Sequence, residues 1–213
     1  MSKPDRRTVL RGAGVTLLGA GWGMAQRQPD CNCARGSDGT PLDTGVSEIR
    51  PAIERFYFST FTIEAPGTVD GGDICEAGDH FFIGLSHRTN EEGARQLTAC
   101  LNAVGYTVSI VDIRSIQTIL HLKSAISYIG DNTIIVMEEM AANPQFSRFD
   151  LLRVSAGESY AANCVRVNDR VLIAEGYPRL CNDLVIRSFA PLVLNMSEFQ
   201  KMDGGLSCLS LRF

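Results

Sequence analysis

The sequence lacks several features that mark large classes of protein. Its 213 residues include one tryptophan, three histidines and no run of the ~20 apolar residues that a membrane-spanning helix needs. The seven cysteines, at 31, 33, 75, 100, 164, 181 and 208, do not show the paired CxxC spacing of structural zinc sites. The net charge of -4 is opposite in sign to that of most nucleic-acid-binding proteins. These absences exclude a membrane span and a zinc ribbon and disfavour a nucleic-acid partner.

The first 25 residues differ from the rest. Arg6 and Arg7 precede a weakly apolar, glycine-rich run, and a small-residue site follows before Gln26. This layout is typical of a twin-arginine export signal, so we expect a periplasmic or secreted protein; a cytoplasmic protein with a helical extension is the alternative. The polar segment 26–45 predicts a linker, and 46–213 the folded domain.

Removal of residues 1–25 makes the chain more acidic. It leaves 16 basic and 23 acidic residues, a net charge of -7. This balance disfavours nucleic acid or an anionic membrane as partner and is compatible with a small cationic substrate.

A strand-turn-strand-helix-strand unit recurs three times after Val46. In the first copy, a capping box of Thr89 and Glu92 predicts the start of the helix and Gly105 its end. The expected strands of the three copies are 74–76, 81–85 and 107–113; about 121–129, 133–137 and 151–154; and 164–167, 170–174 and 192–194. The second and third helices are expected near 144–149 and 178–189. Such repeats predict a radial α/β array in which each unit covers its neighbour.

Two related loops carry glycine pairs, Asp70-Gly71-Gly72-Asp73 and Asp203-Gly204-Gly205. Glycine lets the backbone approach a ligand, so these loops could bring Asp70, Asp73 and Cys208 to one central site; tight turns with capping aspartates are the alternative. His121, between two leucines, is either a core histidine or the partner of a nucleophilic cysteine. Three other cysteines are expected to be small buried hydrophobes: Cys75, Cys100 and Cys164.

Five segments resemble the bacterial dimethylarginine dimethylaminohydrolases, which belong with arginine deiminases and amidinotransferases. They are Glu64–Ile74, Gly84–Asn90, Leu120–Lys123, Tyr160–Asn163 and Asp203–Phe213. The resemblance implies a pentein fold, a five-bladed α/β propeller of ββαβ modules around a polar channel. It also implies hydrolysis of ω-N-methylated arginine to citrulline and methylamine or dimethylamine, with no metal or cofactor.

The resemblance also implies roles for individual residues. Cys208 matches the nucleophile that forms an S-alkylthiouronium intermediate, and His121 matches the general acid and base. Asp70 matches the third catalytic residue, which accepts guanidinium N–H bonds. Arg88 matches a position that binds the substrate carboxylate, Met202 offers its carbonyl to the amino group, and Asp73 is placed with the substrate-binding residues.

The family has a complete module upstream of about Val46, and no counterpart is recognisable here. We therefore expect a propeller that is incomplete at its N-terminus, with exposed strand edges. Three outcomes are open: an impaired enzyme, a homo-oligomer that completes the ring, or an inactive homologue that serves as a small cationic-ligand-binding or scaffold protein. A related arginine deiminase activity is the other alternative.

Overall fold

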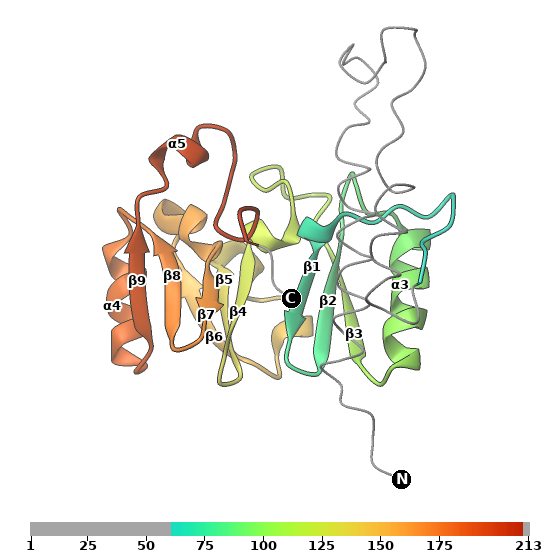
Figure 1. Ribbon diagram of the computed structural model, residues 1–213, viewed down its shortest axis with the longest axis horizontal. Helices are drawn as coiled ribbons and strands as arrows, with labels where there is room; N and C mark the ends of the chain where they lie inside the picture. Colours follow the sequence, from blue (N-terminus) through green and yellow to red (C-terminus); the bar gives the residue numbers. More distant parts are fainter. Residues whose placement is uncertain (1–60, 211–213) are drawn as a thin grey trace, which may run out of the picture.

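The computed structural model describes residues 61–210, and the expected signal, linker and first part of the domain lie outside this range. Three mixed sheets stand in a row, with α3 at one end and α4 beside β9 at the other (Figure 1). None of the helices in residues 61–210 is long and apolar enough to span a bilayer. The described part of the chain is therefore an α/β array of repeated three-stranded units, as predicted.

Each sheet consists of an antiparallel hairpin followed by a parallel third strand. The strands are β1 Ile74–Ala77, β2 His80–Leu85 and β3 Thr107–Asp112 in the first module; β4 Ile126–Gly130, β5 Thr133–Met137 and β6 Asp150–Val154 in the second; and β7 Val165–Val167, β8 Arg170–Ala174 and β9 Ala190–Leu194 in the third. All nine agree with the predicted strands to within a few residues, except that β4 begins at Ile126 rather than near His121.

The crossovers before the third strands differ in length. The first is α3, Glu91–Ala103, and the third is α4, Pro178–Ile186; a short helix α5, Ser197–Gln200, follows β9. In the second module the expected helix is only a single 3₁₀ turn at Pro144–Phe146. The capping-box prediction was wrong: Asn90 is the N-cap of α3, and its side chain accepts a hydrogen bond from Gly93 N at 2.8 Å. Thr89 is instead buried, and its hydroxyl donates to Asp73.

The first sheet has one face toward its own crossover and the other toward the second module. In the first sheet, Phe81 and Ile83 pack in the cluster beneath α3. Phe82, on the opposite face, contacts Phe146 and Phe149 of the second module, with ring centroids 5.1 and 5.5 Å apart. Burial of aromatic and branched side chains at this boundary joins the modules into one core.

Candidate active site

The loop before β1 carries the first acidic group of the site. Asp70 is the N-cap of a 3₁₀ turn at Gly71–Asp73, where its Oδ1 accepts a hydrogen bond from Gly72 N at 2.8 Å. Its own N–H donates to Thr89 Oγ1 at 2.9 Å. These bonds hold the Asp70 carboxylate at the end of the sheet with only Oδ2 directed to other side chains.

His121 lies against this loop. A methyl group in place of the Gly72 hydrogen would come within 2.6 Å of two ring carbons of His121, so only glycine allows the imidazole to lie so close to the backbone. His121 Nε2 is 3.4 Å from Asp70 Oδ2 and 3.2 Å from Arg88 Nη1. A protonated Nε2 donates to Asp70, whereas an unprotonated Nε2 accepts from Arg88. The predicted catalytic pair of Asp70 and His121 is thus brought together by a glycine contact.

Arg88 completes a three-way contact. Its Nη1 lies 3.5 Å from Asp70 Oδ2 as well as 3.2 Å from His121 Nε2. Its backbone N–H donates to Ser86 Oγ at 2.9 Å, which fixes the start of the side chain on the loop after β2. The Arg88 side chain remains 33% exposed, so one side of the group is open to solvent.

Asp73 is fully buried and supports the same loops from beneath. Its Oδ2 accepts hydrogen bonds from the hydroxyls of Ser86 at 2.6 Å and Thr89 at 2.7 Å. Its Oδ1 accepts from Leu122 N, the residue after His121, at 3.1 Å. The carboxylate therefore joins the segments that carry Asp70, Arg88 and His121, and in this arrangement it contacts protein groups rather than an open cavity.

The two aspartates have opposite pKa shifts. Burial raises the pKa of Asp70, but hydrogen bonds from His121 and Gly72, with the charges of His121 and Arg88, bring it below its ordinary value. Burial also raises the pKa of Asp73, and there the bonds from Ser86, Thr89 and Leu122 only partly offset it. Asp70 is the carboxylate suited to a cation at neutral pH.

The C-terminal turn that carries Cys208 is attached to the segment between β6 and β7. Tyr160 donates its hydroxyl to Gly204 O at 2.6 Å, and Asn163 Oδ1 accepts from Ser207 N at 2.9 Å. Gly205 packs directly against the Asn163 amide, where a larger residue would overlap it. Cys208 follows on an exposed turn, and its N–H donates to Gly205 O at 3.0 Å.

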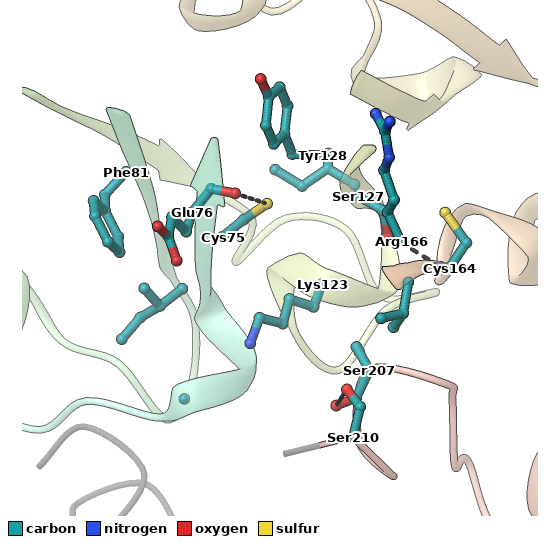
Figure 2. Close-up of a pocket in the computed structure, with 14 residues that line it drawn as sticks. Cys75, Glu76, Phe81, Lys123, Ser127, Tyr128, Cys164, Arg166, Ser207 and Ser210 are labelled. Carbon is teal, nitrogen blue, oxygen red and sulfur yellow. Dashed lines mark hydrogen bonds between the residues drawn. The ribbon is translucent and has the colours of Figure 1, made fainter. Parts of the chain in front are cut away.

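A cavity of about 210 Å³ lies where the first strands of the three modules meet. Cys75, Tyr128 and Val165 contribute to its wall from β1, β4 and β7. Figure 2 shows Ser207 and Ser210 on the side of the cavity nearest Lys123. Gly71 also lines it, so the turn that carries Cys208 and the loop that carries Asp70 border the same space.

The two cysteines that line this space are poor nucleophiles. Cys75 and Cys164 are buried, and burial raises the pKa of both thiols, that of Cys164 to about 12. Cys100, expected to be buried, is only partly covered. Among residues 61–210, Cys208 is the exposed free thiol.

The predicted site residues therefore fall into two groups. Asp70, His121 and Arg88 are in mutual contact, with Asp73 beneath them. Cys208 lies on a separate turn whose Ser207 and Ser210 line the central cavity, and Met202 is 83% exposed on the segment after α5. The predicted roles of these residues in turnover stay predictions.

The sequence did not predict that four polar side chains hold these loops together, and it assigned Thr89 to a capping box instead. Ser86, Thr89, Tyr160 and Asn163 lie within segments that carry the family resemblance. A hydroxyl two residues before Arg88 and an amide near the start of β7 have no distinctive spacing, so only their partners in space reveal what they do.

Comparison with known proteins identifies the family. A sequence model of the family described as "Arginine deiminase" matches residues 48–172. The dimethylarginine dimethylaminohydrolase of Pseudomonas aeruginosa is 43% identical over 166 residues, 78% of this chain and 64% of that protein. The Streptomyces coelicolor protein of the same name is 33% identical over 170 residues, 79% of this chain and 62% of that protein. The chain thus spans slightly less than two thirds of the length of these relatives.

Solved structures extend the likeness to the fold. The Pseudomonas aeruginosa enzyme in complex with citrulline matches with a TM-score of 0.73 and 41% identity, covering 82% of this chain and 68% of that one. The N-terminal domain of a cyanobacterial arginine dihydrolase matches with a TM-score of 0.71 and 15% identity, covering 94% and 76%, and supports the fold alone. These neighbours confirm the predicted pentein architecture, and the chain belongs to the arginine deiminase family and resembles the dimethylarginine dimethylaminohydrolases.

Proposed function

We propose that the protein hydrolyses ω-N-methylated arginine to citrulline and methylamine or dimethylamine. The observation that carries the proposal is the pair of Asp70 Oδ2 and His121 Nε2, 3.4 Å apart, with a guanidinium group, that of Arg88, in contact with both. The acceptors that now contact the Arg88 guanidinium are the kind that the guanidinium of a substrate also needs. The 43% identity to the Pseudomonas aeruginosa relative supports the same conclusion.

In the proposed reaction, the Cys208 thiolate attacks the guanidinium carbon to form a tetrahedral adduct. The C–N bond to the methylated nitrogen then breaks, and His121 gives a proton to the departing amine. The product of this step is a thiouronium in which the carbon is bound to sulfur. Water, deprotonated by His121, attacks that carbon, and the C–S bond breaks to release citrulline and the thiol.

Asp70 has an electrostatic role in this scheme. Its ionised carboxylate accepts guanidinium N–H bonds and orients the planar group, and its lowered pKa keeps it ionised at neutral pH. We assign Arg88 to the substrate carboxylate and the Met202 carbonyl to the substrate amino group. Asp73 supports these residues through Ser86, Thr89 and Leu122.

The direct test is citrulline formation by the purified full chain with asymmetric dimethylarginine. A Cys208→Ser variant should lose the product, whereas Cys181→Ser, at a partly covered cysteine of α4, should retain it. If neither the parent chain nor the Cys181→Ser variant forms citrulline, the proposal is wrong. Faster formation of citrulline from unmethylated arginine would favour an arginine deiminase instead.

A binding protein without turnover is the second candidate. The exposure of Cys208, on a turn held by Tyr160 and Asn163, favours it. Binding of dimethylarginine to the parent chain without any product would select this candidate.

We also propose that the chain pairs with a second copy through the third sheet. Phe82 of the first sheet and Ile135 of the second are completely buried, whereas Leu172 at the corresponding register position is only partly covered. Two copies could cover this apolar face mutually. Light scattering should give a mass above the 23.2 kDa of one chain, and Leu192→Lys, but not Ile110→Lys on the first sheet, should lower it. If the measured mass equals that of one chain at every protein concentration, the proposed pairing is wrong.

Export by the twin-arginine route is a separate proposal, supported by Arg6, Arg7 and the run that follows them. Residues 1–25 fused to a reporter should direct it across the membrane, and Arg6→Lys with Arg7→Lys should prevent this. Equal export of both fusions would contradict the proposal.

A further inference from the structure

The Arg88 guanidinium lies where a guanidinium ligand would meet Asp70 and His121. Arg88 Nη1 is 3.5 Å from Asp70 Oδ2 and 3.2 Å from His121 Nε2. The two acceptors belong to side chains that are only 9% and 16% exposed, so they present little surface to any further ligand.

A guanidinium has five N–H donors and no acceptor, and an incoming one needs the acceptors that Arg88 now contacts. Asp70 Oδ1 already accepts from Gly72 N, which leaves Oδ2 as the free carboxylate oxygen. Two guanidinium cations at Oδ2 would also repel each other at short range. Occupation by Arg88 and by a ligand is therefore mutually exclusive at these atoms.

The arginine is held at its backbone and free at its end. Ser86 Oγ accepts from the N–H groups of both Arg88 and Thr89, at 2.9 and 3.1 Å, and Asp73 fixes that hydroxyl in turn. The guanidinium contacts only Asp70 and His121 among the hydrogen-bond partners in residues 61–210, and the side chain is one-third exposed. Rotation of the side chain can withdraw it without disturbing the loop.

We propose that Arg88 is an internal competitor for the guanidinium site and thereby sets its specificity. The inference rests on the proposed function of this site. A ligand with a guanidinium but no carboxylate must displace Arg88 without compensation. A ligand that also carries a carboxylate gives the displaced Arg88 a new partner, so the site favours guanidino acids over simple guanidinium ions.

Two probes in a Cys208→Ser background test this, since that change removes the reactive thiol. Methylguanidinium has no carboxylate, and Nω-methylarginine has one. We expect Arg88→Ala to bind methylguanidinium about two- to five-fold more tightly than the Arg88 parent, the range for loss of a partly exposed ion pair. The same variant should bind Nω-methylarginine more weakly. Affinities are measured by titration calorimetry.

Arg114→Ala is the matched control, because Arg114 also pairs with an aspartate, Asp112, but on the surface, and should change neither affinity. A general loosening of the fold would weaken both probes, so opposite changes identify competition. If Arg88→Ala binds methylguanidinium with unchanged or lower affinity, the competition by Arg88 is wrong. The proposed hydrolysis to citrulline is not affected by that result. If neither probe binds any variant, both the inference and the guanidinium site of the proposed function are wrong.

Discussion

At the residue scale, the candidate site depends on one buried carboxylate, that of Asp73, whose hydrogen bonds are all with protein groups. Asp73 accepts three hydrogen bonds, and their donors lie on the loop after β2 and directly after His121. The two hydroxyls cannot easily switch from donating to accepting at Asp73, because each already accepts another bond: Ser86 Oγ from Arg88 N and Thr89 Oγ1 from Asp70 N. A single side chain thus sets the positions of the groups above it.

We expect Asp73→Asn to destabilise the protein by about 1–3 kcal/mol, the cost of an unsatisfied buried polar group. In either orientation of the asparagine amide, its NH₂ group faces a hydrogen-bond donor: the hydroxyls of Ser86 and Thr89 on one side or the N–H of Leu122 on the other. Urea unfolding should show this loss, and Asp79→Asn, at an exposed aspartate paired with Arg148, should cost much less. Equal costs would contradict the role of Asp73.

A second residue-scale prediction concerns acid stability. Burial and then the charge of Arg148 lower the pKa of His80 to about 4, and its Nε2 has no partner within the described residues. The unfolded chain binds this proton first, so the free energy of unfolding should fall as the pH drops from about 6.5 to about 4. His80→Phe should make this slope shallower, whereas His87→Gln, at an exposed histidine, should not. Identical slopes in all three proteins would refute the assignment.

At the element scale, tertiary contacts outweigh local preferences at the start of α3. Thr89 and Glu92 form a sequence pattern typical of a capping box, yet Asn90 caps the helix because Asp73 and Asp70 bind Thr89. Gly93 in the first turn is buried against the backbone of Thr68.

This contact reverses the usual effect of glycine in a helix. Gly93→Ala should gain up to ~1 kcal/mol from helix propensity. The added methyl group would overlap the Thr68 carbonyl, so we expect a net loss in urea unfolding. Gly157→Ala has open space around the new methyl group and should be near neutral. If Gly93→Ala is more stable than the parent, the Thr68 backbone can move away from the added methyl group at little cost, and the prediction is wrong.

At the scale of the whole molecule, coverage by a neighbouring module decides what a leucine contributes. Leu152 of β6 and Leu192 of β9 occupy the same register position in their sheets. Leu152 packs in the main core and is 2% exposed, whereas Leu192 is 44% exposed.

Leu152→Ala should therefore lower the free energy of unfolding by about 2–5 kcal/mol, and Leu192→Ala by less than ~1 kcal/mol. Unfolding measured at low protein concentration checks this, since pairing of chains would add a contribution at Leu192. Similar losses in both variants would mean that the β9 face is covered in the monomer.

Local patterns by themselves determined the order of the strands and the helices of the first and third modules: period-two apolar runs, glycine turns and a helix stripe each depend on neighbours within a few residues. Motif resemblance added the family and the identity of Asp70, His121 and Arg88. Only the tertiary structure decided that Asp73 lies beneath these residues and bonds to their loops, that Arg88 contacts both Asp70 and His121, and that Cys208 lies on an exposed turn. Such facts depend on which groups compete for the same hydrogen-bond acceptors across distant segments, and sequence spacing carries no record of that competition.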